Sequence, residues 1–193
     1  MRKVLFIESG FGYGGASKCL FLLLEYIDRS KIEPQVLYYN YGPNIQLIEE
    51  IGILSKKYCF SSLFFSIFRV DVVYINNEIY SHFFNIIFAK FFRKRCICHV
   101  RGIRSLTRRE KILKSWIDEF VTVSNTCKEN LVQEGISPGK IRVIYDGIEQ
   151  DGIELERKAD SGFRIGVVGR IDAEKGQDIF VMAAREIVKK DTR

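Results

Sequence analysis

Short apolar runs alternate with helical patterns through most of this 193-residue sequence. The runs are apolar nearly throughout, which is typical of strands buried on both faces of a parallel sheet. The helical patterns place apolar residues along one face, so each helix is expected to cover such a sheet. The sequence therefore predicts an α/β fold with a Rossmann-like, doubly wound parallel sheet. The expected strands are residues 4–8, 35–39, 71–75, 96–100, 120–123 and 141–145, with residues 57–60 as a further candidate.

Capping signals mark the ends of several expected helices. Helices are predicted at residues 16–27, 44–51, 79–92 and 124–134, and from Thr107 onward. Thr107 and Glu110 have the spacing of a capping box. Gly52 ends one helix, and Gly135 followed by Ile136 is typical of a Schellman ending. The aromatic stretch that continues to residue 68 gives an ambiguous pattern.

The alternation stops after the first domain and then starts again. We predict a domain at residues 1–148, a linker rich in charges and glycine at 149–162, and the start of a second domain at 163–193. That start holds a strand at 164–168, a loop at 169–177 and a helix at 178–190. One strand and one helix cannot bury a core, so we expect a second Rossmann-like domain that is truncated.

Three features argue for a cytoplasmic protein. No apolar stretch approaches the roughly 18 residues that a membrane-spanning helix needs. The first ten residues end at a glycine loop instead of a signal-peptide cleavage site. Five cysteines, an odd number without framework spacing, suit a reducing compartment.

Positive charge is concentrated in one block of the chain. The net charge is +6, and the segment from Lys90 to Lys114 holds ten basic residues beside a single acid, Glu110. Such a block attracts an anionic membrane, a nucleic acid or a polyanionic substrate. The alternative is an ordinary solvated basic face. The basic residues are Lys90, Arg93, Lys94, Arg95, Arg101, Arg104, Arg108, Arg109, Lys111 and Lys114.

A glycine-rich loop, residues 10–15, follows the first strand and opens the first helix. Its glycines let backbone N–H groups approach a ligand, and the helix N-terminus favours an anion. The spacing also fits a dinucleotide fingerprint, but that fingerprint requires an acid after the second strand. Here the second strand ends in Tyr38, Tyr39 and Asn40. The loop is therefore a weak signal, and a plain tight turn is the alternative.

Two further positions carry candidate chemistry. Arg170 follows the strand predicted at 164–168, and Lys175 precedes the next helix, an arrangement that suits a diphosphate. Solvated loop charge is the alternative. His99 ends a predicted strand, where parallel sheets bind ligands, and is either a ligand-binding or a core residue. His82 is expected to be structural, as are Cys96 and Cys98, because no second pair of ligands completes a zinc site.

Taken in order, these segments resemble the family-4 glycosyltransferases of the GT-B fold. The resemblance rests on GYGGAS after the first strand, DVVYINN, CHVRG, VTVSNTCKENLVQEGISPGKIRVIYDGIE, and FRIGVVGRIDAEKGQDIFVMAA. The last two segments are the specific ones. The chain departs from the family where Ser17-Lys18 follows the loop, where Tyr145-Asp146-Gly147 precedes the linker, and where a paired-glutamate segment would follow Arg193.

The resemblance implies a retaining transfer of a sugar from a nucleotide-sugar donor, without a cofactor or a bound metal. The acceptor is expected to be a saccharide or a lipid-linked molecule in polysaccharide or glycolipid synthesis. It implies that Arg170 and Lys175 bind the donor diphosphate, that Gly14 and Gly15 face the phosphates, and that His99 lies near the transferred sugar.

The resemblance also bears on partners and on location. It favours an anionic membrane surface as the partner of the segment from Lys90 to Lys114, at the inner face of the membrane, and no nucleic acid. Residues 1–193 alone are expected to be inactive. The alternatives are an NAD(P)-type dinucleotide-binding domain and a non-catalytic module.

Overall fold

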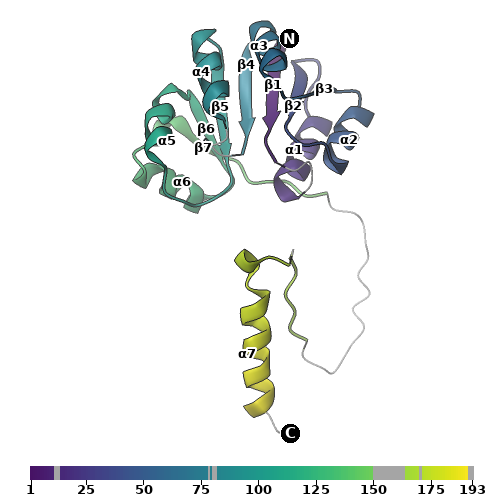
Figure 1. Cartoon of the computed structure of the whole chain (residues 1–193), viewed down its shortest axis with the longest axis vertical. Helices are drawn as coiled ribbons and strands as arrows, with labels where there is room; N and C mark the ends of the chain where they lie inside the picture. The colour runs from purple at the N-terminus through teal and green to yellow at the C-terminus, as the bar shows by residue number, and fades with distance from the viewer. Residues whose placement is uncertain (11–13, 78, 80–81, 150–163, 170, 191–193) are drawn as a thin grey trace. The chain divides into compact units, whose positions relative to one another are not determined.

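Seven parallel strands form one sheet in the order β3-β2-β1-β4-β5-β6-β7 (Figure 1). The computed structural model describes residues 1–10, 14–77, 79, 82–149, 164–169 and 171–190. The chain divides into two units, Met1–Glu149 and Gln150–Arg193, and the sheet belongs to the first. The strands are β1 (Arg2–Glu8), β2 (Ile32–Tyr38), β3 (Leu54–Lys57), β4 (Val72–Asn76), β5 (Arg95–Val100), β6 (Glu119–Thr122) and β7 (Ile141–Val143).

The strand order reverses at β1, which pairs with both β2 and β4. Ligand sites of open parallel sheets lie outside the carboxyl ends of the strands at such a switch point. The register aligns Glu8 with Asn76, and Asn76 with His99. Three polar residues from three neighbouring strands therefore end at the same edge of the sheet.

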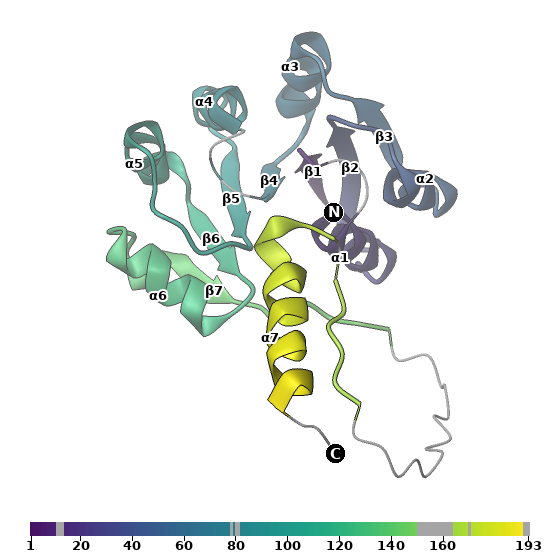
Figure 2. The same ribbon diagram turned by 60° about the horizontal axis from the view of Figure 1, so that its bottom comes forward.

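Helices cover both faces of the sheet, so the doubly wound fold is confirmed (Figure 2). On one face, α1 (Gly15–Glu25) and α2 (Pro43–Glu50) pack Leu20, Leu24 and Ile48 against β1 and β2. The second cluster of core residues combines strand residues with side chains from α3 (Phe60–Arg69), α4 (Phe83–Phe91), α5 (Arg108–Leu113) and α6 (Asn125–Gln133). Short 3-10 helices occupy Lys114–Trp116 and Pro138–Lys140.

The predicted capping signals are confirmed. The Thr107 side chain accepts from the Glu110 backbone N–H, and the Glu110 side chain accepts in return from the Thr107 backbone. Ser124 caps α6 by accepting from the Cys127 N–H at 3.1 Å. At the other end of α6, Gly135 has a φ of 80°, and the Ile136 N–H donates to the Leu131 carbonyl at 3.0 Å, which is the Schellman bond.

The segment around residues 57–68 differs from the prediction. The strand β3 ends at Lys57, where a strand was expected to begin, and α3 follows from Phe60. Cys59 and Ser62 form a capping box that starts this helix. Its buried residues Leu63, Ser66 and Ile67 have helical spacing, which the many aromatic residues between them hide in the sequence.

In the second unit the predicted helix is confirmed and the predicted strand is wrong. The helix α7 spans Gln177–Lys190, after a 3-10 helix at Ala173–Lys175. Residues 164–168 form no strand in the described part of the chain. A strand requires a hydrogen-bonded neighbour. The described residues of the second unit contain no strand that could pair with residues 164–168.

Candidate functional site

A buried polar cluster lies at the carboxyl ends of β1, β4 and β5. Glu8 and Asn76 are fully buried, and His99 is 5% exposed. Buried polar side chains are costly unless they are hydrogen-bonded, so a cluster of them at a ligand-binding edge needs a structural or a functional reason.

Glu8 ties the glycine-rich loop to the end of β4. Its carboxylate accepts from the Gly10 backbone N–H at 2.6 Å, from the Asn77 side chain at 3.3 Å, and from the Asn76 side chain. Asn76 also donates to the Ala16 carbonyl in the first turn of α1, at 3.2 Å. Burial raises the pKa of Glu8 above its usual value, and the hydrogen bonds from Asn76 and Gly10 and the charge of Arg101 oppose the shift only in part.

Two hydrogen-bonding groups lie within reach of the same ring nitrogen of His99, Nδ1. The Tyr74 hydroxyl lies 2.7 Å and the Arg101 guanidinium 3.2 Å from Nδ1. Nε2 is buried and has no hydrogen-bond partner among the described residues. Burial, followed by the positive charge of Arg101, lowers the pKa of His99 to about 4.

Arg101 connects the histidine to the segment after β7. Its guanidinium forms an ion pair with Asp146 and donates to the Asn76 side-chain oxygen at 3.4 Å. Burial and the nearby carboxylate of Asp146 raise the pKa of Cys19, which lies beside the same pair. The ion pair thus joins β5, α1 and the end of the first unit at one point.

The glycine-rich loop enters α1 through Gly14, whose φ of 93° favours glycine. The Gly14 carbonyl accepts from the Lys18 N–H at 3.0 Å, and the first turn of α1 contains no acid. A Cβ built on Gly14 or Gly15 would meet no atom of the described residues within 4 Å. The described start of α1 therefore offers a helix N-terminus without an acidic residue in its own first turn, which favours an anion.

The end of β2 bears on the dinucleotide alternative. Asn40 stands where that fingerprint requires an acid, and its side chain donates to the Gly10 carbonyl at 3.2 Å. Asn40 therefore anchors the glycine-rich loop, and it offers no carboxylate to a ribose.

The sequence-predicted residues of the second unit are only partly described. Arg170 lies outside the described residues. Lys175 is exposed and ends the 3-10 helix one residue before Gly176, whose carbonyl accepts from the Phe180 N–H of α7 at 2.9 Å. Its expected position before a helix is confirmed, while its role stays a prediction.

The residues expected to be structural are buried. Cys96, Cys98 and His82 are at most 1% exposed, and Asn85 bonds the His82 ring at 2.7 Å. Among the described residues, no group of three or more His, Cys, Asp or Glu side chains is placed to hold a metal ion.

The sequence analysis named His99 as a candidate site residue but not the residues that surround it in the structure. These are Glu8, Tyr74, Asn76, Arg101 and Asp146. A signal was present for Glu8 and Asn76, because each is a polar residue at the carboxyl end of a run that is otherwise apolar. No local pattern indicated that Arg101 and Asp146 form a pair, since 45 residues separate them.

A comparison with protein families decides the assignment. The family model described as Glycosyltransferase Family 4 matches residues 13–151, well over half of the chain. The chain belongs to this family. The family resemblance of the sequence is thereby confirmed. No curated protein shows significant similarity to the sequence.

Solved structures agree on the fold of this family-4 chain. It is similar to Anabaena HepE in complex with UDP and glucose, with a TM-score of 0.64 at 19% identity over 77% of this chain and 45% of that chain. It is also similar to the lipopolysaccharide outer core galactosyltransferase WaaB, with a TM-score of 0.54 at 18% identity over 76% and 46%.

A third similar structure has another activity. The UDP-GlcNAc 2-epimerase of Methanocaldococcus jannaschii matches with a TM-score of 0.51 at 16% identity over 73% of this chain and 45% of that chain. The fold is thus shared by a galactosyltransferase and an epimerase, so the fold alone does not decide the activity. The matched part of this chain covers less than half the length of each of these three proteins.

Proposed function

We propose that this chain contributes the acceptor-side domain of a retaining glycosyltransferase. In this proposal a sugar passes from a nucleotide-sugar donor to a saccharide or lipid-linked acceptor, in polysaccharide or glycolipid synthesis. The observation that carries the proposal is the buried cluster of Glu8, Asn76 and His99 at the switch point of the sheet, in a chain of family 4. The complexes of HepE with UDP and glucose support a nucleotide-sugar donor.

The proposed chemistry needs positive charge but no metal. When the sugar–phosphate bond breaks, negative charge develops on the leaving diphosphate, and fixed donors stabilise it. We assign this role to Arg170 and Lys175, with Gly14 and Gly15 offering backbone N–H groups to phosphate oxygens. His99 is assigned to the transferred sugar. Because the matched part of this chain covers less than half of HepE and of WaaB, we propose that residues 1–193 alone do not complete the donor site.

The test measures sugar transfer by the full-length gene product from a panel of UDP-, GDP- and ADP-sugars. Arg170→Ala and Lys175→Ala are each expected to lower turnover by about 100- to 1,000-fold, the usual effect of losing one charge-stabilising donor. Lys189→Ala is the matched control, because Lys189 is exposed and pairs with Glu186 on α7. Rates near wild type would remove Arg170 and Lys175 from the site, and transfer by residues 1–193 would contradict the proposed inactivity.

We also propose that the protein is cytoplasmic and docks on the anionic inner face of a membrane. Within the described residues, no helix is both long and apolar enough to cross a membrane. The structure divides the basic block into parts. Arg101 and Arg104 pair with Asp146 and Glu110, and Lys114 donates to the carbonyls of Glu134 and Gly135.

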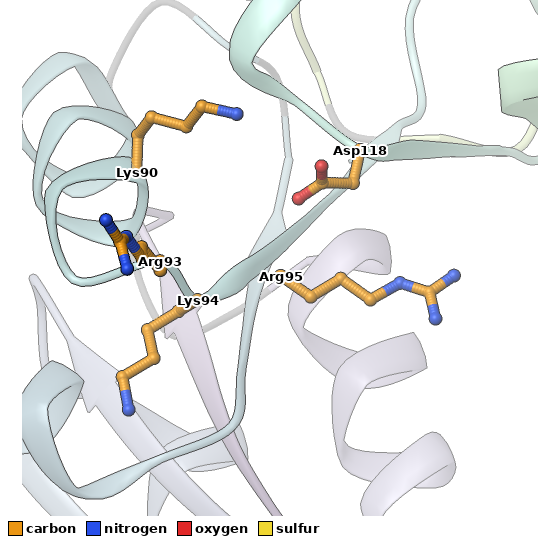
Figure 3. Close-up of a pocket in the computed structure, with 5 residues that line it drawn as sticks. All are labelled: Lys90, Arg93, Lys94, Arg95 and Asp118. Carbon is orange, nitrogen blue, oxygen red and sulfur yellow. The ribbon is translucent and has the colours of Figure 1, made fainter.

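Four other basic residues of the block surround one hollow, and one of them, Arg95, forms an ion pair with Glu119. Lys90, Arg93, Lys94 and Arg95 line a hollow of about 470 Å³ with Asp118 (Figure 3). We call it the basic hollow. It lies at the amino end of β5, whose 6 residues span about 20 Å, so it is remote from His99 at the carboxyl end.

An aromatic face adjoins the basic hollow. It comprises the exposed phenylalanines of α3 and α4, of which Phe65, Phe68 and Phe91 are 63%, 65% and 76% exposed. The two helices meet through ring contacts such as Phe68 with Phe92, at 6.1 Å. Lys94 donates to the Phe68 carbonyl at 3.3 Å, which joins the aromatic face to the hollow. Its other members are Phe60, Phe64, Phe83 and Phe84.

This combination suits an anionic bilayer. Exposed rings insert at the interface between headgroups and acyl chains, while the cations meet lipid phosphates. A second copy of the chain would bring like charges together. The aromatic face begins at the carboxyl edge, where α3 and α4 start, so a docked membrane would bring a lipid-linked acceptor towards that edge.

Vesicle co-sedimentation tests the docking. Vesicles with phosphatidylglycerol are expected to bind the chain, and neutral phosphatidylcholine vesicles to bind it weakly. Replacing Lys90 and Arg93 by Gln removes about 2 kcal/mol of attraction, or roughly 30-fold in affinity. The same change at Arg108 and Arg109, in the basic block but not in the hollow, is the control. Equal binding to both kinds of vesicle would end the docking proposal.

A further inference from the structure

The two groups on His99 Nδ1 determine which ring nitrogen carries the proton. A guanidinium can only donate hydrogen bonds, so the Arg101 N–H that lies 3.2 Å from Nδ1 needs a lone pair there. Burial raises the pKa of Tyr74, which keeps its hydroxyl protonated and able to donate to the same nitrogen. A neutral imidazole with Nδ1 unprotonated carries its hydrogen on Nε2.

The charge state of the ring follows from the same surroundings. The charged groups that face His99 are Arg101, from its own segment, and Asp146, from the segment after β7. Burial and Arg101 lower the pKa of the ring to about 4, and Asp146 opposes them weakly. His99 is therefore neutral at physiological pH, and its Nε2–H is a buried donor without a partner among the described residues.

We propose that Tyr74 and Arg101 are positioning residues, which hold His99 as the neutral Nε2–H tautomer so that its ring donates a hydrogen bond to a ligand oxygen and does not act as a base. Asp146 holds the Arg101 guanidinium in place through their ion pair. That the ligand is a sugar rests on the proposed function, whereas the tautomer does not.

A buried donor without a partner is the kind of group that a ligand satisfies. Leaving such a donor unpaired disfavours the structure, so a polar group kept in this state is a candidate for ligand binding. A sugar hydroxyl oxygen can accept the bond. A side-chain amide in place of the ring can also donate a hydrogen bond, but it cannot act as a base. Replacing His99 by an amide residue therefore distinguishes the two roles.

Nitrogen-15 NMR of the labelled chain tests the tautomer directly. The sequence contains two histidines, so long-range proton–nitrogen spectra hold only the rings of His82 and His99. For His99 we expect a protonated Nε2 and an unprotonated Nδ1, with no protonation of the ring between pH 8 and 5. In Tyr74→Phe combined with Arg101→Met, we expect both tautomers of His99, and protonation of the ring at higher pH than in the wild type.

Arg95→Met removes an exposed arginine of the same strand and should leave the His99 signals unchanged, and His82 is an internal reference in every spectrum. Tyr74→Phe alone keeps the ring packed against Phe6 if the double variant does not fold. A protonated Nδ1 in the wild-type chain would overturn the proposal, as would an unchanged tautomer in the folded double variant.

Sugar-transfer activity tests the donor role of His99 separately from the NMR experiment. In a full-length protein that transfers sugar, His99→Gln is expected to retain more activity than His99→Ala, because the glutamine amide can donate from near the position of Nε2. Turnover should show no inflection from His99 between pH 5 and 8. Absence of any transfer would contradict the proposed function and leave the NMR result standing. Equal loss in both variants together with a protonated Nδ1 would overturn the donor role itself.

Discussion

At the scale of the residue, Glu8 is the carboxylate on which the polar cluster depends. It is fully buried and accepts from the Gly10 N–H and from the side chains of Asn76 and Asn77. Burial raises its pKa, so the folded protein binds a proton more tightly than the unfolded chain does. Its contribution to stability is therefore greatest below the unfolded pKa of 4.5 and falls as the pH rises through the folded pKa.

Replacing Glu8 by Gln should lower the free energy of unfolding by about 1–3 kcal/mol, because the amide group leaves one of the three donors unpaired. The difference between wild type and variant should narrow as the pH rises from 4 to 8, since only the wild type loses the contribution of a protonated Glu8. Urea denaturation across this range measures both quantities. A difference that widens with pH would show that the pKa of Glu8 is not raised.

At the scale of the element, the start of α1 separates a glycine needed for the backbone from one that is not. Gly14 has a φ of 93°, whereas Gly15 is the first helical residue, and a Cβ on it would meet no atom of the described residues within 4 Å. Both glycines belong to the proposed phosphate-binding loop, but only Gly14 is required by local geometry.

We expect Gly14→Ala to destabilise the domain by about 1 kcal/mol or more, since an L-residue is strained at this φ. Gly15→Ala should leave stability unchanged or raise it slightly, because alanine favours a helix. Thermal unfolding followed by circular dichroism compares the two. If Gly15→Ala also weakens binding of a nucleotide diphosphate to the full-length protein, the open space serves the ligand. Equal destabilisation by both changes would contradict this distinction.

The capping box of α5 provides a second test at this scale. Thr107→Ala removes the side-chain oxygen that accepts from the Glu110 N–H and should cost about 1 kcal/mol of stability. Thr107→Ser keeps that oxygen and is the matched control. Chemical denaturation should therefore rank serine near the wild type and alanine below it, and the reverse order would refute the capping assignment.

At the scale of the whole molecule, the first unit contains both clusters of core residues. Every buried apolar residue in these clusters lies between Val4 and Ile141. None of the side chains described between residues 164 and 189 is buried. The free energy of folding should therefore come from Met1–Glu149, because apolar burial is the main favourable contribution.

A chain of residues 1–149 is expected to fold alone, with the same urea midpoint as residues 1–193. Residues 150–193 alone should be weakly helical, because an isolated helix of 14 residues is marginal in water. Circular dichroism of the two separate chains measures this. A loss of cooperative unfolding in residues 1–149 would show that the core depends on the second unit.

Much of the fold was predictable from sequence because its signals are local. Short apolar runs predict buried strands. Thr107, Ser124 and Gly135 indicate helix ends through hydrogen bonds to residues only a few positions away. Where several signals overlapped, as around Cys59 and Phe60, the aromatic residues obscured the helical period and the boundary was wrong. The prediction of a strand at 164–168 was wrong for a different reason. A strand needs a neighbouring strand to bond with, and an apolar run in the sequence does not show that one is present.

The sequence by itself determined the parallel sheet, its capped helices, the family and the candidate position of His99. Only the tertiary structure decided what surrounds that histidine. Glu8 and Asn76 are 68 residues apart in sequence and meet because β1 and β4 are neighbours in the sheet. Tyr74, Arg101 and Asp146 likewise come from three segments. Hydrogen bonds and ion pairs between distant segments leave no local pattern, so the position of the proton on His99 and the pairing of Arg101 with Asp146 follow from folding alone.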